Sequence, residues 1–319
     1  MNNKDDGKGY PKVSSAPPGR NAKEWVERDK KVISQSYTRS YPLVVERGEG
    51  ASIIDVDGNR YLDFTSGIAV TSTGHCHPKV VDAIKKQAEI LIHMSGTDFY
   101  YPSEVRLAEK LVSITPGKNQ KKVFFTNSGA ESTEAAMKLA RYHTKRPHFI
   151  AFYGGFHGRT MGALSVTASK PVHRKGFAPL VPEVTHIPYA YCYRCSFEQN
   201  QEDCDIECLK FLKDVVFKHK IPPEEVAAIF VEPIQGEGGY VVPPKPFMSR
   251  MDSIAKEFGI LLIADEIQSG MGRTGKMFAS EHFGLLPDII TIAKGIASGM
   301  PLGAMVANSD VMDWESGSH

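Results

Sequence analysis

Two short apolar runs, each leading into one charged residue, constrain the fold of this chain more than any other feature. Ile260–Ala264 leads into Asp265, and Ile289–Ala293 leads into Lys294. Runs of this length that are rich in Ile and Leu predict buried strands of an α/β sheet. Because ligand sites of such sheets lie at the carboxyl ends of the strands, we expect both charged side chains to face one crevice.

The pairing of Asp265 with Lys294 indicates pyridoxal phosphate (PLP) chemistry. Taken alone, an Asp after a strand is commonly a helix cap, and a Lys there is commonly solvated. Together they suit PLP, because a Lys amine forms a Schiff base with this cofactor. The Asp keeps the pyridine nitrogen protonated, so that the ring accepts electrons.

Two segments then give a resemblance to a known family. ADEIQSGMGRTG (264–275) and DIITIAKGIASGMPLGA (288–304) resemble the signature of the class-III, fold-type I PLP aminotransferases, and most of all the 4-aminobutyrate and ornithine aminotransferases. Lys294 follows Asp265 by 29 residues, as in that family, and the similarity runs from about residue 16 to the end. The resemblance implies an α/β fold with a mainly parallel sheet flanked by helices. It makes Lys294 the catalytic residue, Asp265 the partner of the ring nitrogen and Gln268 the neighbour of the phenolic oxygen.

Residues 123–141, VFFTNSGAESTEAAMKLAR, predict a strand, a Ser-Gly turn and a helix. A helix N-terminus has free N–H groups and a positive dipole end, which suit a phosphate. Gly129 allows a close approach of the backbone. The bare pattern occurs in many α/β proteins, and it is the resemblance that assigns the PLP phosphate to Ser128, Gly129 and Ala130.

Residues 150–160, IAFYGGFHGRT, place a Gly pair before an aromatic and a basic residue. Without the resemblance, Phe156 would be an ordinary core residue and Arg159 a solvated one. The resemblance implies that Phe156 stacks on PLP with His157 beside it, and that Arg159 pairs with the distal carboxylate of the substrate. The planar fork of Arg suits that task, because it meets a carboxylate in a bidentate manner.

Residues 226–239, VAAIFVEPIQGEGG, predict a third buried strand and a Gly-rich loop. From the residues alone, Glu232 and Glu237 are loop acids at a strand end. The resemblance places Glu232 near the cofactor. It also makes Glu237 a gate that pairs with an Arg near the C-terminus and swings away for dicarboxylate substrates.

The loop SGIAVTSTGHCHP (66–78) holds a His-x-His pair, which would need a third ligand to make a metal site. We favour a simple loop that enters a helix begun by Pro78. The resemblance implies that this loop borders the substrate, with Ile68 as an apolar wall.

Four of the five cysteines lie within residues 189–209 and form Cys192-x2-Cys195 and Cys204-x3-Cys208. This spacing suits a tetrahedral zinc site with four thiolate ligands, or less readily an iron–sulfur cluster. Disulfides are disfavoured in a reducing cytosol. Four free thiols in a surface insertion are the alternative, and any role is structural.

The formal charge of +1 and the pI near 7.7 give no electrostatic case for binding nucleic acid or membrane. No apolar run approaches the roughly 18 residues of a spanning helix. The first residues lack the apolar core of a signal peptide, which favours a cytoplasmic enzyme. We expect a flexible leader over 1–20, an N-terminal segment over 21–65 with a helix near 22–35 and a hairpin over 51–64, and a large PLP domain over 66–319.

The resemblance implies transfer of an amino group from an ω-amino acid, such as 4-aminobutyrate or ornithine, to an oxo acid such as 2-oxoglutarate. It also implies a homodimer or a dimer of dimers. A PLP-dependent amino-acid racemase of the same family is the alternative, and a non-catalytic scaffold organised by metal at the cysteines is a remote one. Relatives continue beyond DVMDWESGSH into a small C-terminal domain, so we expect these 319 residues to be a fragment that turns over poorly alone.

Overall fold

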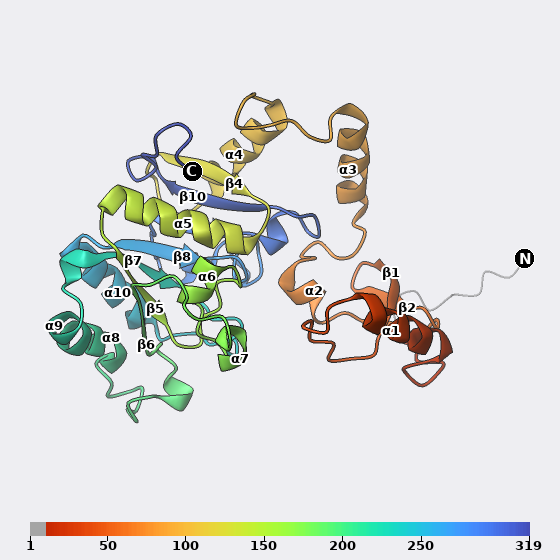
Figure 1. Ribbon diagram of the computed structural model, residues 1–319, viewed down its shortest axis with the longest axis horizontal. Helices are drawn as coiled ribbons and strands as arrows, with labels where there is room; N and C mark the ends of the chain where they lie inside the picture. The colour runs from red at the N-terminus through yellow and green to blue at the C-terminus, as the bar shows by residue number, and fades with distance from the viewer. Residues whose placement is uncertain (1–10) are drawn as a thin grey trace, which may run out of the picture. The chain divides into compact units, whose positions relative to one another are not determined.

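The structure is a computed structural model that describes residues 11–319 (Figure 1). The chain divides into two compact units after Thr97. The first unit contains α1 (Arg20–Val32), β1 (Val45–Glu49), β2 (Ser52–Asp55), β3 (Arg60–Leu62), α2 (Ser66–Ala69) and α3 (Pro78–Ile90).

The second unit holds most of the regular structure. Its helices are α4 (Pro102–Ile114), α5 (Gly129–Thr144), α6 (Met161–Val166), α7 (Pro171–Arg174), α8 (Glu207–Phe211), α9 (Phe217–His219) and α10 (Lys245–Phe258). Its strands are β4 (Lys121–Thr126), β5 (His148–Phe152), β6 (Val184–Ile187), β7 (Val226–Val231), β8 (Leu261–Asp265), β9 (Ile289–Ile292) and β10 (Gly303–Asn308).

The first unit is built on an antiparallel sheet in the order β1-β2-β3. The turn between β2 and β3 forms because the Asp55 carboxylate accepts hydrogen bonds from the backbone N–H groups of Asp57 (3.0 Å) and Asn59 (2.8 Å). Such Asx contacts favour turns. Asp57 in turn accepts from the first N–H groups of α1. The hairpin predicted over 51–64 and the helix near 22–35 are therefore both present.

The leader predicted over 1–20 is not free along its whole length. Lys12 pairs with Arg60 of β3, and the backbone N–H groups of Ser14 and Ser15 donate to the Asn59 side chain. Residues 12–15 of the predicted leader are therefore hydrogen-bonded to the hairpin, while its flexibility stays a prediction. Residues 1–10 of that predicted leader lie outside the described residues.

The boundary between the units also differs from the one expected after residue 65. His75 pairs with Gly50 through backbone hydrogen bonds, and its ring contacts the Asp63 carboxylate at 2.7 Å. These contacts join the segment after residue 65 to the small sheet, so the division falls at Thr97. The helix that Pro78 begins is present as α3.

The second unit is organised by a seven-stranded sheet in the order β4-β10-β9-β8-β7-β5-β6. The five strands from β6 to β9 run parallel, and β10 is antiparallel to both of its neighbours. The mainly parallel α/β sheet is thereby confirmed. Because β10 is antiparallel to both β4 and β9, these two strands run in the same direction as each other. The carboxyl ends of all the strands except β10 therefore lie at one edge of the sheet.

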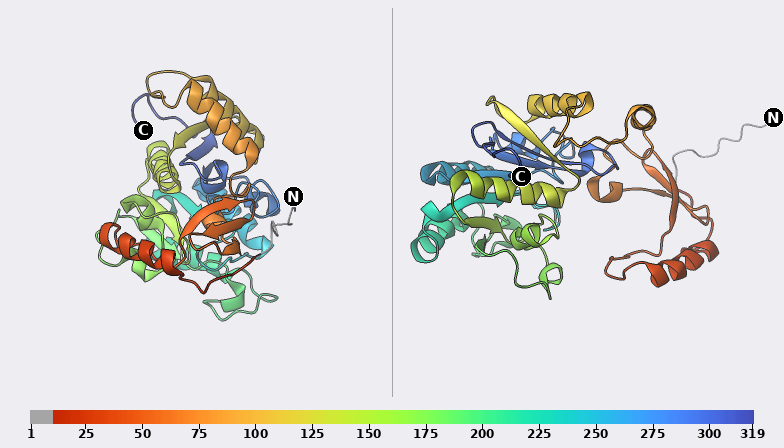
Figure 2. Two further views of the ribbon diagram at one scale, coloured as in Figure 1. Left: turned by 90° about the vertical axis from the view of Figure 1, so that its right-hand side faces the viewer. Right: turned by 45° about the horizontal axis from the view of Figure 1, so that its top comes forward.

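Helices cover both faces of this sheet, as Figures 1 and 2 show for α5 and α10. Alternate residues of one strand enter different cores, because successive side chains point to opposite faces. Phe149 of β5 packs with the α5 residues, whereas Ile150 packs with residues of α8 and α10. A third cluster lies around Leu111 of α4 and Ile290 of β9. No helix within residues 11–319 is both long and apolar enough to pass through a membrane.

Candidate active site

The carboxyl edge of the large sheet brings the acidic site residues together. Val231 of β7 pairs with Ala264 of β8, so the next residues along, Glu232 and Asp265, end neighbouring strands. Lys294 follows β9 on the other side of β8. The predicted common crevice for Asp265 and Lys294 thus has its physical basis in three adjacent parallel strands.

Asp265 and His157 form a buried pair. The His157 Nδ1 lies 2.6 Å from Asp265 Oδ2, and both side chains are at most 3% exposed. Burial lowers the pKa of His157, but the hydrogen bond and the negative charge of Asp265 outweigh it, and the net pKa is raised. The other carboxylate oxygen of Asp265 accepts from the N–H of Ile267 at 3.0 Å. A carboxylate has about four lone-pair sites, so Asp265 keeps acceptor capacity for a further donor.

Glu232 is buried at the end of β7, 6% exposed, and points back under the turn after β5. Its carboxylate accepts from the backbone N–H of Phe156 at 3.0 Å and of Gly236 at 3.2 Å. Burial raises its pKa to about 7; the negative charge of Asp265 adds to this, while His157 and the two N–H groups oppose it. Such a group exchanges a proton near neutral pH, as acid–base groups of active sites do.

Lys294 has three features of a reactive amine. Burial lowers the pKa of its amine, although the charges of Asp265, Glu232 and Glu237 act against that effect. The Nζ donates a short hydrogen bond to Gln268 Oε1. Its backbone φ is 51°, in the left-handed region that is uncommon for a residue with a Cβ. Strained residues of this kind concentrate at functional sites, where the surrounding structure holds them.

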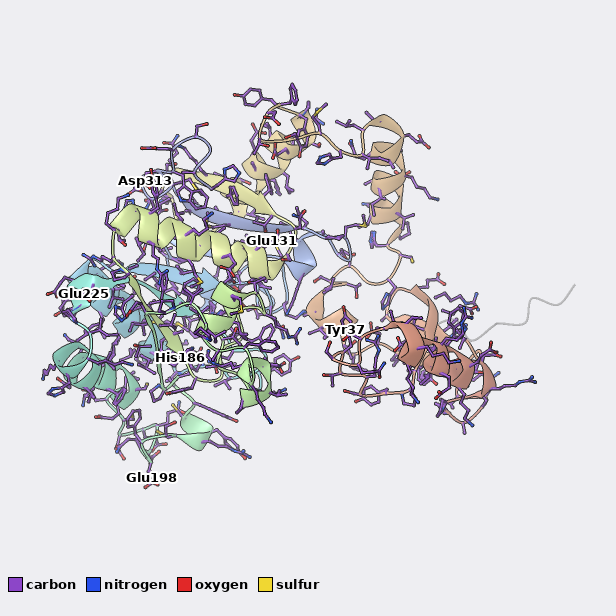
Figure 3. All side chains as sticks on the ribbon, viewed as in Figure 1. Tyr37, Glu131, His186, Glu198, Glu225 and Asp313 are labelled. Carbon is purple, nitrogen blue, oxygen red and sulfur yellow. The ribbon has the colours of Figure 1, made fainter. Side chains whose placement is uncertain are left out.

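The N-terminus of α5 faces the same edge of the sheet, after the end of β4. Ser128 is its N-cap, and its hydroxyl accepts from the N–H of Glu131 at 3.3 Å. Glu131, labelled in Figure 3, accepts in turn from the backbone N–H of Asn127 at 2.8 Å. The N–H groups of Gly129 and Ala130 belong to the first helical turn, which has no partners within the helix. This end of α5 can therefore hold an anion.

Phe156 and Arg159 lie on the turn after β5. The Arg159 guanidinium lies 5.2 Å from the centre of the Phe156 ring, and His173 contacts the same ring edge-on. Arg159 is exposed. Glu237 is likewise exposed and pairs with Lys170 at 2.5 Å. The residues that the sequence assigns to substrate binding in this unit are thus the accessible ones, in contrast to the buried Asp265 and Glu232.

Gln268 packs on the Gly-rich loop after β7. A Cβ built on Gly236 would come within 2.6 Å of the Gln268 side-chain nitrogen, so a larger residue there would force the Gln268 side chain to move. Gln235, 3% exposed, donates to the backbone oxygen of Tyr153 at 3.0 Å and joins this loop to the turn after β5.

Several residues that position the site have only a weak signal in the sequence. Thr133 donates to the carbonyl of His157 at 2.9 Å, and Thr167 accepts from the His157 N–H at 2.9 Å, so the backbone on both sides of this ring is fixed. Ser132 donates to the carbonyl of Ile292 at 3.2 Å and joins α5 to the strand before Lys294. The only signal available was a cluster of Ser and Thr inside segments with helical or turn patterns.

Two predicted groups lie apart from this site. Ile68 belongs to the first unit, where its side chain is 69% exposed, and its assignment stays a prediction. The cysteine quartet comprises Cys192, Cys195 and Cys204 of the loop between β6 and α8, and Cys208 at the start of α8. All four are free thiols. Within the described chain, no three His, Cys, Asp or Glu side chains are arranged to hold a metal ion, so the zinc site predicted from the spacing is not preassembled.

A profile of the family described as Aminotransferase class-III matches residues 33–319. The chain belongs to this family. It is 44% identical over 315 residues to the alanine/serine racemase of Pyrococcus horikoshii, and the match covers 97% of this chain and 66% of that protein. It is 41% identical over 290 residues to a protein of Bacillus subtilis named "probable 4-aminobutyrate aminotransferase", covering 91% and 66% respectively.

A solved structure gives the same result for the fold of this class-III member. The taurine:2-oxoglutarate aminotransferase of Bifidobacterium kashiwanohense, in complex with PLP and glutamate, matches with a TM-score of 0.84 and 31% identity. The match covers 92% of this chain and 66% of that one. The chain thus spans just under two thirds of the length of each of these proteins. The family resemblance stated from the sequence motifs is confirmed.

The residues of this site fit PLP, the cofactor that the family implies. Asp265 offers a buried carboxylate with acceptor capacity left, which suits a protonated ring nitrogen. Lys294 offers an amine with a lowered pKa beside it. The first turn of α5 offers backbone N–H groups for a phosphate.

Proposed function

We propose that this protein is a PLP-dependent aminotransferase. It would transfer an amino group from an ω-amino acid, 4-aminobutyrate- or ornithine-like, to an oxo acid such as 2-oxoglutarate. The observation that carries the proposal is the arrangement of Glu232, Asp265 and Lys294 at three adjacent strand ends in a class-III family member. PLP, when bound, supplies an electron sink for the carbon that loses its proton.

The residues of the chain divide the remaining tasks. Lys294 would anchor the cofactor and then carry a proton between the substrate carbon and the cofactor carbon next to the ring, because its amine is partly desolvated. Asp265 would keep the ring nitrogen protonated by charge pairing, and His157 fixes the orientation of that carboxylate. Ser128, Gly129 and Ala130 would hold the phosphate, while Phe156 would stack on the ring and Gln268 would contact the phenolic oxygen.

Arg159 is the residue that we assign to the distal carboxylate of the substrate. Its guanidinium is exposed and lies over the Phe156 ring, so it is available to a carboxylate from solution. We assign Glu237 as a gate that regulates access by dicarboxylates. Its single ion pair with the exposed Lys170 is of a kind that contributes about 0–1 kcal/mol, so the Glu237 side chain moves readily.

A PLP-dependent amino-acid racemase is the second candidate. The 44% identity to an alanine/serine racemase favours it specifically. The two reactions differ in where the proton goes after it leaves the substrate carbon. In racemisation it returns to that carbon on either face, whereas in transamination it moves to the cofactor.

The test is a panel of amino donors given to the full-length protein together with 2-oxoglutarate. Each donor is scored for oxo-acid product and for exchange between enantiomers. Oxo-acid formation from 4-aminobutyrate or ornithine supports the aminotransferase. Enantiomer exchange without stoichiometric oxo acid would replace it by the racemase.

Assembly and location belong to the same proposal. We infer a homodimer, or a dimer of dimers, because the family resemblance implies such an assembly. We also infer a location in the cytoplasm. Light scattering of the purified full-length protein tests the first, and a monomer with full activity would refute it. Fractionation of the source cells tests the second.

A further inference from the structure

The loop between β6 and α8 is long for a connection in a compact unit. Residues 188–206 contain one short 3₁₀ turn, Cys192–Arg194, and otherwise only irregular turns. Connections longer than about 12–15 residues without regular structure are uncommon in such units unless they are functional or disordered. Figure 3 labels Glu198 on this loop. Its length therefore makes this loop a candidate for a functional or structural role.

The cysteine quartet surrounds one cavity in this loop. The cavity has a volume of about 170 Å³ and is lined by all four cysteines, together with the rings of Tyr189, Tyr191 and Phe197. Cys192 and Cys195 come from the limb that leaves β6, whereas Cys204 and Cys208 come from the limb that enters α8. Each limb thus contributes two thiols to the lining of the one cavity.

The thiol groups also have a backbone environment that suits metal ligands. The N–H of Phe197 donates to the Cys195 sulfur at 3.4 Å. Hydrogen bonds from the backbone to ligand sulfurs orient thiolates and stabilise their charge, and metal sites use them as a second layer of contacts. Cys208 sits in the first turn of α8, so its Cα is held by regular structure.

The side chains as placed do not meet at one point, but the cavity gives them room to do so. A cavity needs only about 10–15 Å³ to accept a water molecule, far less than this one provides. Tetrahedral zinc bound at about 2.3 Å from each sulfur sets the sulfurs about 3.8 Å apart. To reach such an arrangement, the thiols on the two limbs would have to rotate about their side-chain bonds and the loop would have to move.

We propose that the cysteine quartet binds one zinc ion through four thiolates and that this ion fixes the loop between β6 and α8. Binding replaces four S–H bonds by four Zn–S bonds and releases four protons to solvent, with no change in oxidation state. The site is structural, because four protein ligands leave zinc no open position for substrate.

This site also has a route to the active site. Tyr189 lines the cavity, and its hydroxyl donates to the backbone oxygen of Glu232 at 3.0 Å. The ion would hold the loop that begins at Tyr189, and through it the turn after β7. It thus stabilises the active-site edge without taking part in the chemistry.

The test uses the full-length protein, expressed with added zinc and purified under reducing conditions without chelators. We expect about one zinc per chain, and sulfur-only coordination with four ligands by X-ray absorption. Cobalt in place of zinc should give the visible bands of a tetrahedral thiolate site. Cys192→Ser and Cys208→Ser should each lower the zinc content severalfold, whereas Cys76→Ser, at the exposed fifth cysteine in the other unit, should leave it unchanged.

Four outcomes would overturn the proposal. These are metal-free protein with four titratable thiols in the quartet, disulfides within the quartet, iron in place of zinc, and zinc content that the quartet variants leave unchanged. If the Ser variants do not fold, X-ray absorption of the unmodified protein still decides the ligand set. Metal content is independent of turnover, so failure here leaves the proposed aminotransferase function untouched.

Discussion

Replacing His157 by Phe should destabilise the cofactor-free protein by about 3–5 kcal/mol, the range found when one partner of a buried ion pair is removed. This range applies because the two side chains are 1% and 3% exposed and 2.6 Å apart, so water does not screen them. Exposed pairs contribute only about 0–1 kcal/mol. The Phe ring keeps the contact with Phe230, so the change tests the pairing with Asp265 and not the packing.

A double-mutant cycle isolates that pairing. Free energies of unfolding are measured by urea denaturation for His157→Phe, Asp265→Asn and the double variant. Because each single change leaves the other partner buried alone, we expect an interaction energy of about 2–3 kcal/mol. Free energies that add to within about 0.5 kcal/mol would refute the reasoning.

The pH dependence of the free energy of unfolding tests the same pair independently. The folded-state pKa of His157 is raised, so its contribution is fully present below the ordinary value of 6.5 and declines as pH rises through the higher folded-state value. The stability gap between the native protein and His157→Phe should therefore narrow above neutral pH. His186→Phe is the matched control. Burial lowers the pKa of His186 to about 4. The difference in stability between the native protein and His186→Phe should therefore narrow as pH falls from 6.5 to 4.

Three further predictions concern catalysis and pH. Lys294→Ala should lose the borohydride-reducible link to PLP and nearly all turnover while the fold remains by circular dichroism; a link that survives would sink the assignment of Lys294. Arg159→Ala should lower kcat/KM for 4-aminobutyrate roughly tenfold to a hundredfold, the loss of a charged hydrogen-bond pair of about 1.5–3 kcal/mol. Amines without a distal carboxylate, and the control Arg194→Ala, should change little. Glu232 binds a proton in the folded state between its ordinary pKa of 4.5 and about 7, so the cofactor-free protein should lose about 3 kcal/mol of stability across that range. Glu232→Gln should reduce this loss of stability with rising pH. If stability falls with pH equally steeply in the variant, the loss belongs to another titrating group.

The parts of the fold that the sequence predicted are those that a local pattern specifies. The strands ending near Asp265 and Lys294 are continuous apolar runs, and every residue of β8 and β9 is buried. The helix that begins after Ser128 is marked in the sequence by a residue type that favours the N-cap position, followed by Gly129. Strand β10 was missed although it is also fully buried. Its residues adjoin the family signature, and no local pattern shows that it runs antiparallel.

The parts that were missed depend on contacts between distant segments. Thr133 and Thr167 fix His157 from positions 24 and 10 residues away, and Thr occurs in so many settings that neither attracts notice. The first unit extends to Thr97 and not only to residue 65. One contact that joins this added segment to the small sheet is that of His75 with Asp63, which the sequence spacing does not reveal. For the cysteine quartet the sequence was the more informative source. The spacing predicted a site with four ligands, whereas the structure places the four thiols around one cavity but not in the geometry of a metal site.

The site separates into buried and exposed residues, and this separation bears on how one scaffold could serve different reactions. Asp265, His157 and Glu232 are buried and hydrogen-bonded from several elements, so their geometry resists change in the surrounding loops. Arg159 and Glu237 are exposed; Arg159 contacts the Phe156 ring, and Glu237 pairs with the exposed Lys170. Under the proposed function, the first set would serve the chemistry that racemases and aminotransferases share, and the second set would select the substrate. The sequence is similar both to a racemase and to a protein named as a probable aminotransferase, so we expect substitutions at the exposed positions to show what sets the specificity of this protein.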